Sequence, residues 1–410
     1  MRGGLGLPTT RVLRAAPVAP RAYYVPVPAL VRWTFYLFVF SIPFEAPAHA
    51  LPLEVTTITG ALFLLTTLMQ PERFFRWPPR AVWAFLAYSG VYWVAVALGG
   101  APLLAEATKS FAFLLQGILI CWAAYHVLQD SRVTHVALVI LGVACAILAV
   151  MTLFGIMTSL SVDDSDVVRL TVLGQNPNRA ARILMSGLLV LVGVAYGRDR
   201  PLIRPRFLIW PFAALIGFAI IQGGSRGGLL ALAVGLATFM FAGNNLTTKV
   251  RNVVVGLLAL TLLVIVVLAS PLMQRRLAQA EQGNLAKREE IYPAALRMVA
   301  ERPWIGWGAE NQYELARRLP WEHRTTRDTH NLVLHVLTSA GLIGALPFFA
   351  GILLALGAAW TGRHGALGML PLALLLALMA GNMSANNIAL KVQWLALALA
   401  LASVHLRDRR

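Results

Sequence analysis

The sequence predicts an all-α polytopic membrane protein with about 12 transmembrane helices and one long external segment. Of its 410 residues, 58% are hydrophobic and 13% are charged, and the mean hydropathy is +0.69, whereas soluble domains are about 45–50% apolar. The apolar residues fall into long runs, and a helix needs about 20 of them to cross a hydrocarbon core of about 30 Å. Cys121 and Cys145 lie inside such runs, so they indicate neither disulfides nor a metal site.

Twelve apolar runs lie between polar breaks, and we expect one span in each. They lie near residues 30–45, 51–70, 82–100, 107–128, 133–159, 180–196, 207–223, 227–243, 251–271, 331–360, 366–382 and 390–406. The first 29 residues are basic and Pro-rich and lack the apolar core of a cleaved signal peptide, so we expect a cytoplasmic tail. The predicted regions are a tail (1–29), helices 1–9 (30–271), an external segment (272–330), and helices 10–12 with a second cytoplasmic tail (331–410).

The distribution of Lys and Arg predicts the orientation, because short cytoplasmic loops collect these residues. Alternate breaks are net basic or neutral, and they lie at 71–80, 129–132, 197–206, 244–252 and 362–364. The short breaks between them are poor in Lys and Arg, and they lie at 45–50, 99–106, 161–179 and 381–389. Both ends are therefore predicted in the cytoplasm. Much of the +17 net charge comes from Lys and Arg in the predicted cytoplasmic loops. The charge is thus explained by membrane orientation, and we expect no nucleic-acid partner.

The external segment, residues 272–330, is long enough to be translocated whatever its charge, and such long connections usually have a function. Its stretch "AKREEIYPAALRMVAERPWIGWG" predicts an amphipathic helix that stops at Arg302-Pro303. The expected apolar face consists of Ile291, Ala295, Leu296 and Val299. Such a helix is expected at the membrane surface, with three tryptophans at headgroup level: Trp304, Trp307 and Trp321.

Two arginines on the external side are candidates for binding an anion. Arg226 lies among four glycines in "QGGSRGG" (222–228), where the backbone can turn tightly and a ligand can approach; the alternative is an arginine that reaches to lipid headgroups. Arg288 begins the amphipathic helix in "KREE"; the alternative is a solvated helix face on which it pairs with Glu289 or Glu290. These residues alone leave both alternatives open.

His330 and Asn331 stand where the charged part of "RTTRDTHNLVLHVLTSAGLIG" (324–344) gives way to an apolar helix. The histidine is either a satisfied interfacial residue or a base, since its ordinary pKa of about 6.5 lets it accept a proton near neutral pH. Asn331 beside it could hydrogen-bond a substrate. Because guanidinium groups match phosphate oxygens, arginines with one histidine favour a phosphate-containing substrate and proton abstraction.

An acidic loop offers a competing interpretation, in which a metal ion takes part. "VDDSDV" places Asp163, Asp164 and Asp166 together, and their oxygens could hold a hard divalent ion; the alternative is a solvated turn. We favour the turn and expect no metal and no cofactor. The sequence also lacks a Gly-rich phosphate loop of the strand-to-helix type.

The order of four motifs resembles the O-antigen ligase and polymerase superfamily. These are "GQNPNRAA", "GGSRGG", "KREEIYPAALRMVAERPWIGWGAENQY", and finally "HN" followed nine residues later by "GLIG". The resemblance covers residues 170–345, and its most specific element is His330-Asn331 with Gly341 and Gly344. One departure is "TSAG" before Gly341, where many members carry an acidic residue.

The resemblance implies an inverting, metal-independent glycosyltransferase of GT-C-like architecture in the bacterial inner membrane, with a periplasmic active site. It would transfer O-antigen polysaccharide from undecaprenyl pyrophosphate to a hydroxyl of the lipid A core, so these molecules and membrane lipids are its expected partners. The implied catalytic residues are His330, Arg226 and Arg288. Further residues implied in pyrophosphate or glycan binding are Arg179, Arg182 and Asn331.

Three alternative functions stay open. An O-antigen polymerase or a protein O-oligosaccharyltransferase of the same superfamily would use another acceptor. A polytopic transporter or flippase would place ionisable residues near mid-membrane, whereas the polar residues here crowd the external boundary.

The predicted orientation can be tested with topology reporters. A reporter fused near Gln312 should be periplasmic, and one fused near Pro201 should be cytoplasmic, because the arginine asymmetry puts these residues on opposite sides. Alkaline phosphatase and fluorescent-protein fusions would measure this. Two reporters on the same side would contradict the twelve-span arrangement.

Overall fold

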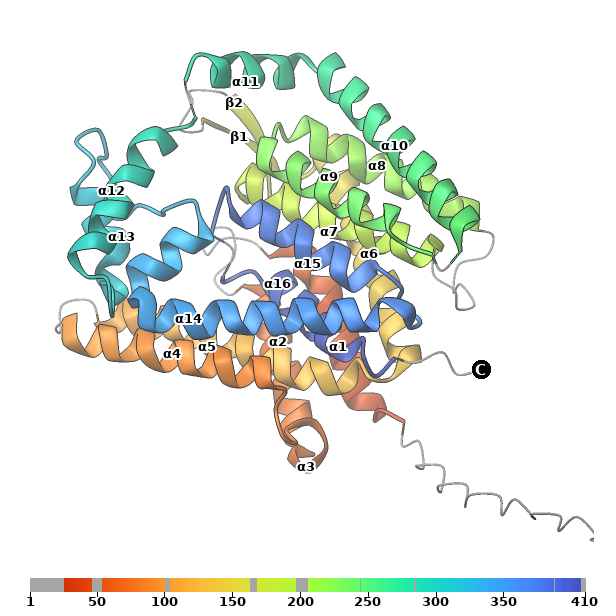
Figure 1. Ribbon diagram of the computed structural model, residues 1–410, viewed down its shortest axis with the longest axis horizontal. Helices are drawn as coiled ribbons and strands as arrows, with labels where there is room; N and C mark the ends of the chain where they lie inside the picture. Colours follow the sequence, from red (N-terminus) through yellow and green to blue (C-terminus); the bar gives the residue numbers. More distant parts are fainter. Residues whose placement is uncertain are drawn as a thin grey trace, which may run out of the picture.

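The computed structural model describes residues 26–45, 54–99, 104–162, 168–196, 206–243, 245–283, 285–386 and 388–406. These ranges are helical apart from one hairpin and the connecting turns (Figure 1). The α-helices are α1 (Ala29–Ser41), α2 (Val55–Leu68), α3 (Pro71–Phe74), α4 (Arg80–Gly99), α5 (Leu104–Val127), α6 (Ser131–Leu153), α7 (Pro177–Tyr196), α8 (Ile209–Gln222), α9 (Arg226–Met240), α10 (Leu246–Ala269), α11 (Pro271–Glu281), α12 (Arg288–Glu301), α13 (Asn311–Arg317), α14 (Leu332–Thr361), α15 (Leu370–Asn382) and α16 (Lys391–Ala402). The 3₁₀ turns are η1 (Ile42–Phe44), η3 (Arg206–Leu208), η4 (Gly308–Glu310) and η5 (Gly362–His364).

Twelve apolar helices in the described ranges lie at the positions of the twelve predicted spans. Six are long and apolar enough to cross a membrane: Arg80–Leu98, Ala107–Val127, Ser131–Leu153, Pro177–Ala195, Leu246–Ala269 and Leu332–His364. The other six have 10–17 residues. At 1.5 Å per residue, the 13 residues of α1 extend only about 20 Å, so such a helix needs its flanking residues to span the bilayer. The almost all-helical fold is confirmed, and the number of crossings stays a prediction.

The hairpin is a departure from the all-α prediction. Strands β1 (Thr158–Val162) and β2 (Val168–Val172) pair antiparallel, with Thr158 opposite Val172. They occupy the break predicted between the fifth and sixth spans. Both strands alternate β-branched or aliphatic residues with polar ones, a pattern that favours strand pairing. The hairpin was not predicted because a five-residue alternation is a weak signal next to long apolar runs.

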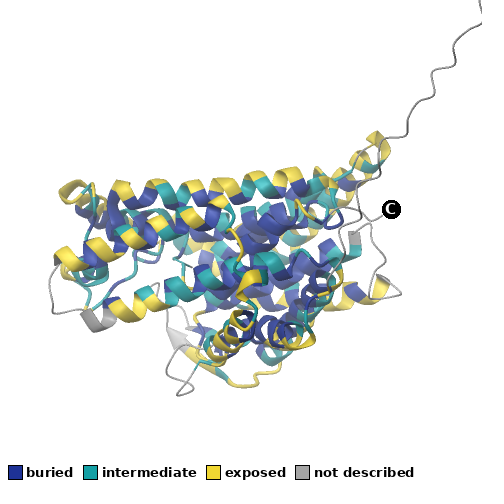
Figure 2. Ribbon diagram, turned by 90° about the horizontal axis from the view of Figure 1, so that it is seen from below, coloured by how far each residue is buried: buried dark blue, intermediate teal, exposed yellow. Residues whose placement is uncertain are grey.

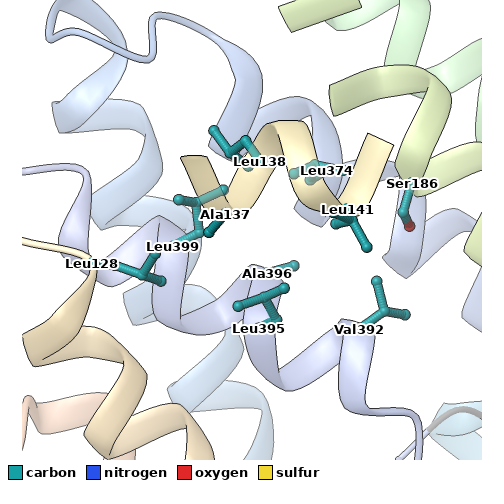
Figure 3. Close-up of a pocket in the computed structure, with 10 residues that line it drawn as sticks. All are labelled: Leu128, Ala137, Leu138, Leu141, Ser186, Leu374, Val392, Leu395, Ala396 and Leu399. Atoms are coloured by element: carbon teal, nitrogen blue, oxygen red, sulfur yellow. The ribbon is translucent and has the colours of Figure 1, made fainter. Parts of the chain in front are cut away.

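The core of the bundle is built around α15 and α16, and Figure 2 shows buried residues through its middle and exposed ones along its outer faces. All 12 residues of α16 are buried. Its alternating alanines and leucines allow neighbouring helices to approach closely. A void of about 20 Å³ between α6, α15 and α16 is lined almost entirely by aliphatic side chains (Figure 3). It holds about one water molecule, so it is a gap in packing and no substrate site.

Helix α10 differs from the others, because it stands at the outer edge of the molecule (Figure 1) and only 6% of its apolar window is buried. Asn252 is its one buried residue. Large aliphatic residues on several sides of the helix are exposed, among them Leu257, Leu258 and Ile265. Exposed apolar surface of this extent is what a helix in contact with lipid presents.

The external segment contains three helices, α11, α12 and α13, and the amphipathic pattern predicted a helix where α12 lies. Helices α12 and α13 form a layer against the start of α14, with a small core of Ile291, Ala294, Ala295, Met298, Leu315, Leu319 and Leu334, whereas Met273 of α11 belongs to the main core. Leu296 was expected in this face but is 56% exposed. The reason is helical geometry: with Ile291 facing inward, Ala294, Ala295 and Met298 follow on the same stripe, whereas Leu296 turns away.

Two of the three tryptophans expected at headgroup level are bound within this layer. The Trp307 indole N–H donates to the carbonyl of Met298 at 3.0 Å, and that of Trp321 donates to Glu290 at 2.6 Å. Trp304 is 64% exposed and stays a candidate for the membrane surface.

The external segment is fixed to α14 through backbone contacts at Gly341. Here φ is 59° and ψ is −165°, a conformation that essentially only glycine adopts, and α14 is broken at this point. Leu342 N–H donates to the Pro303 carbonyl at 2.7 Å and Ile343 N–H donates to that of Trp304 at 3.0 Å. A Cβ atom on Gly341 would lie 2.3 Å from the Trp304 carbonyl carbon. The break therefore supplies both the hydrogen-bond donors and the space.

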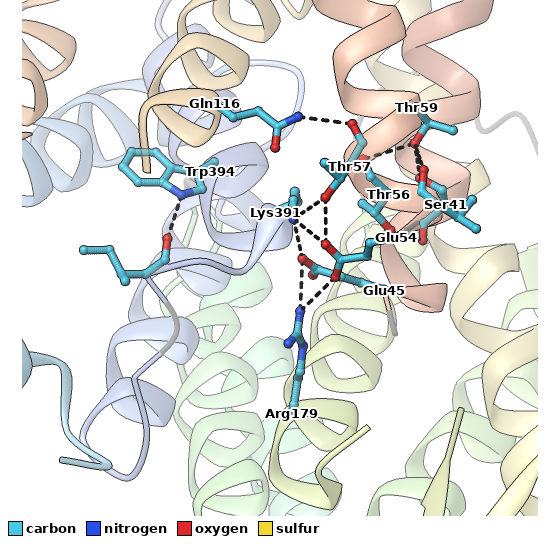
Figure 4. Close-up of polar contacts among 12 residues, drawn as sticks. Ser41, Glu45, Glu54, Thr56, Thr57, Thr59, Gln116, Arg179, Lys391 and Trp394 are labelled. Atoms are coloured by element: carbon cyan, nitrogen blue, oxygen red, sulfur yellow. Dashed lines mark hydrogen bonds and ion pairs between the residues drawn. The ribbon is translucent and has the colours of Figure 1, made fainter. Parts of the chain in front are cut away.

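Four charged side chains form an ion cluster that joins α7 and α16 to the residues around α1 and α2 (Figure 4). Glu45 binds Arg179 at 3.0 Å and Lys391 at 2.9 Å, and Lys391 also binds Glu54 at 3.2 Å. Glu45 is 1% exposed. A buried carboxylate needs opposite charge at this distance, because burial removes its hydration. Arg179, predicted to bind pyrophosphate, is thus held in a balanced internal cluster.

Replacing Gly341 by alanine should lower the thermal stability of the protein. The side chain would both strain the backbone and collide with Trp304, and we expect a loss of about 2 kcal/mol or more. Gly357→Ala in the same helix is the matched control, because its Cβ would meet no atom within 4 Å. Melting temperatures in detergent would measure both, and equal values for the two variants would contradict this account.

The ion cluster should show coupling between Arg179 and Glu45. Arg179→Gln should destabilise the protein by about 1–3 kcal/mol, less than an isolated buried pair because Lys391 still binds Glu45. Adding Glu45→Gln should cost less than the sum of the two single changes. Arg317→Gln is the control, since Arg317 is 81% exposed in its pair with Glu314. Additive losses in a double-mutant cycle of melting temperatures would show that the cluster has no such role.

Candidate functional site

His330 lies immediately before α14 and is held there by its backbone. Its φ is 51°, in the left-handed region that few residues other than glycine adopt. The hydroxyl of Tyr292, from α12, lies 3.4 Å from the His330 carbonyl oxygen, and 3.2 Å from that of Met383. The imidazole is 24% exposed. A backbone conformation of this kind persists where the surroundings fix it, and it is common at functional sites.

Asn331 begins α14 as its N-cap. Its amide oxygen accepts from the N–H groups of Val333 at 2.9 Å and Leu334 at 3.2 Å, and its amide nitrogen donates to the Met383 carbonyl at 3.3 Å. The residue is 7% exposed. This amide therefore fixes the start of the helix and the position of His330, and its predicted contact with the glycan stays a prediction.

Asp328 is a site residue that the sequence analysis missed. One of its oxygens lies 3.8 Å from Nδ1 of His330. The other is buried and accepts no hydrogen bond from the part of the chain that the structure describes. Asp328 also interacts electrostatically with Arg182 and His335. A carboxylate two residues before a histidine, as in "DTH", is a signal that could have drawn attention to it.

Arg288 is turned away from the acidic residues beside it in sequence. Its guanidinium donates to the carbonyls of Leu285 and Ser384, both at 3.0 Å, while Nε is buried without a hydrogen bond in the described ranges. Glu289 accepts instead from the Leu285 N–H, and Glu290 lies 3.7 Å from Lys287. The expected alternative, a pair with Glu289 or Glu290, is therefore not what the structure shows. Because backbone carbonyls are uncharged, these hydrogen bonds do not neutralise the positive charge of Arg288.

Arg226 is the first residue of α9, a helix whose next residue lies against Ser384, and the Ser384 carbonyl accepts from Arg288. The Arg226 guanidinium donates to the carbonyl of Arg276 in α11 at 3.1 Å. A Cβ on the next residue, Gly227, would lie 2.0 Å from the Ser384 hydroxyl, so only glycine permits this contact. Arg169 of the hairpin donates to the Gly223 carbonyl at 2.6 Å and fixes the turn before α9. These glycines were expected to leave space for a ligand, but at Gly227 the space is occupied by Ser384.

Arg182 lies one turn inside α7 and is 2% exposed. Its Nε donates to the Asn178 carbonyl at 2.9 Å, and its side chain lies against Gly381. It interacts electrostatically with Asp328, Arg179 and Arg288. The structure therefore places four of the predicted residues at the end of α15 and the loop that follows it: His330, Asn331, Arg182 and Arg288. For Arg226, the contact with this loop is made by the neighbouring Gly227.

The alternative metal site is not located in the structure. Asp163, Asp164 and Asp166 lie outside the described residues. Among the described residues, no group of three or more His, Cys, Asp or Glu side chains could hold a metal ion. The positive charge around His330 comes from arginines.

Two comparisons with known proteins point to the same family. Residues 211–349, about a third of the chain, match the family described as O-Antigen ligase, and this range includes Arg226, Arg288 and His330. An O-antigen ligase of Pseudomonas aeruginosa is 30% identical over 201 residues, which cover 49% of this chain and 46% of the relative. The match thus spans about half the length of that relative. Over these residues the chain is therefore similar to O-antigen ligases.

Proposed function

We propose that the protein is an inverting glycosyltransferase that moves O-antigen polysaccharide from undecaprenyl pyrophosphate to a sugar hydroxyl of the lipid A core. The observation that carries the proposal is a histidine with a carboxylate at 3.8 Å, held at the same loop as Arg288, whose guanidinium donates to carbonyl oxygens. The similarity of residues 211–349 to O-antigen ligases supports the reaction class. The proposal places residues 272–330 in the periplasm, residues 1–29 in the cytoplasm, and the twelve apolar helices across the inner membrane.

The arginines would act on the leaving group. When the bond between the anomeric carbon and the pyrophosphate oxygen breaks, negative charge grows on that oxygen, and preorganised cations stabilise it. Arg288 binds the Ser384 carbonyl, Arg226 begins the helix whose Gly227 lies against Ser384, and Arg182 adds a further positive charge close to Arg288. Guanidinium groups match two phosphate oxygens at once, so these residues suit a pyrophosphate better than lysines would.

His330 would act on the acceptor. Its imidazole takes the proton of the sugar hydroxyl as the oxygen attacks the anomeric carbon from the face opposite the pyrophosphate. One carbon–oxygen bond forms, the bond to the pyrophosphate breaks, and its electron pair leaves on the phosphate. Asp328, close to Nδ1, favours the protonated imidazole that results and holds its ring in position. No step requires a metal ion or a cofactor.

The proposal is tested by substitutions at His330 and Arg288. Because a positioned base contributes about 10²–10⁴-fold, His330→Ala should lower turnover by that factor while donor binding survives. Arg288→Ala should weaken donor binding as well as turnover, because a phosphate-binding charge acts in the ground state too. Arg288→Lys should restore little if the contact is bidentate. The measurement is transfer of an undecaprenyl-pyrophosphate-linked glycan to purified lipid A core, together with donor affinity.

Matched controls come from the same external segment. His323→Ala and Arg317→Ala change an exposed histidine and an exposed arginine, and both should leave transfer unchanged. Normal turnover in His330→Ala would show that another group accepts the proton. Transfer by the wild-type protein to a second polyprenyl-linked glycan or to a pilin, but not to lipid A core, would favour the polymerase or the protein oligosaccharyltransferase instead.

A further inference from the structure

A large cavity lies beside the candidate site and has a different chemical character. Its volume is about 670 Å³, within the range of about 300–1,000 Å³ that is usual for ligand sites. Side chains of α4, α5, α13 and the start of α14 line it, together with residues between α15 and α16. The lining residues used here are Tyr92, Gln312, Tyr313, His335, Asn386 and Ala389.

The lining suits a carbohydrate. Tyrosine rings offer apolar faces and a hydroxyl, and amides such as Gln312 and Asn386 both donate and accept hydrogen bonds. A sugar has the complementary surface, with C–H faces and hydroxyls that donate and accept. Among the described residues lining the cavity, Lys109 is the one with a full charge, and none is an arginine, an aspartate or a glutamate. The cavity therefore differs from the surroundings of Arg288, where guanidinium groups favour a phosphate.

The cavity borders the same loop as the candidate site. Met383 and Ser384 give their carbonyls to Asn331 and Arg288, and a few residues later Asn386 and Ala389 line the cavity. His335 lines it too, one turn into α14, and its backbone N–H donates to the Asn331 carbonyl at 2.9 Å. Thr326 also lines the cavity, so its lining includes residues on both sides of His330 in the sequence, and a ligand there would lie near the segment that carries His330.

We propose that this cavity binds the saccharide of the acceptor. The inference rests on the proposed function, because displacement with inversion requires the acceptor hydroxyl to approach from the side away from the pyrophosphate. In this arrangement the arginines bind the donor at one part of the loop. The acceptor hydroxyl approaches the anomeric carbon from the cavity, at the other part of the loop. The rings, amides and hydroxyls of the lining recognise the sugar, Lys109 adds a hydrogen-bond donor, and His330, between the lining residues Thr326 and His335 in the sequence, receives the proton.

The test fills the cavity without touching His330 or the arginines. Ala389 is exposed and lines the cavity, so Ala389→Trp adds bulk with little repacking; Ala300→Trp, on the exposed face of α12, is the control. Gln312→Ala removes one amide, and Gln282→Ala at an exposed site is its control. In the full-length protein in nanodiscs, the cavity variants should raise the KM for lipid A core about tenfold or more. The affinity for the polyprenyl-linked donor should stay the same.

A second measurement separates this inference from the proposed function. Binding of purified core oligosaccharide, without donor, should be lost in Ala389→Trp and weakened in Gln312→Ala, and kept in both controls. If the wild-type protein transfers glycan but the cavity variants bind core oligosaccharide normally, the cavity proposal is wrong and the function stands. If the cavity variants lose donor affinity instead, the cavity holds the donor, which also overturns the proposal. If the wild-type protein binds core oligosaccharide in the cavity yet transfers nothing, the proposed function fails and the binding site stands.

Discussion

The backbone contact between Gly341 and the stretch around Trp304 determines where the rest of the external layer lies. It breaks α14 into a short first part, which carries His335, and a long second part inside the bundle. It also fixes the chain between α12 and α13. Helix α12 then presents Arg288 to the loop after α15, and α13 forms one wall of the cavity. Because glycine alone adopts this conformation, both the candidate site and the cavity depend on one residue that has no side chain.

Backbone carbonyls, more than side chains, assemble the candidate site. Where α15 ends, the carbonyls of Met383 and Ser384 accept hydrogen bonds from Arg288, Tyr292 and Asn331, which come from two different parts of the chain. The C-terminal end of a helix carries partial negative charge, and cations are stabilised there. A guanidinium bound to carbonyls keeps its net charge, whereas one paired with a carboxylate does not. This is why Arg288 fits a role in binding an anion and Arg179, paired with Glu45, fits a structural one.

The helices could be predicted from the sequence, because long apolar runs and helix-ending residues such as Arg302-Pro303 are local signals. It also singled out His330, Arg226 and Arg288, since arginine and histidine at a membrane boundary stand out against an apolar background. It missed what depends on distant partners: the Arg179–Glu45 pair joins residues more than a hundred positions apart, and no periodicity reveals such a contact. Asp328 escaped because a single acidic residue in a charged segment resembles its solvated neighbours.

The ion cluster has a consequence for how the protein is made in the membrane. Glu54 and Lys391 are 337 positions apart, so the acidic partners are synthesised long before the lysine that balances them. Arg179 arrives in between and neutralises part of the charge. Helix α16, with every residue buried, begins at Lys391, whose ammonium binds both Glu45 and Glu54. The packing of α16 into the bundle therefore completes the neutralisation of the two carboxylates that Arg179 begins.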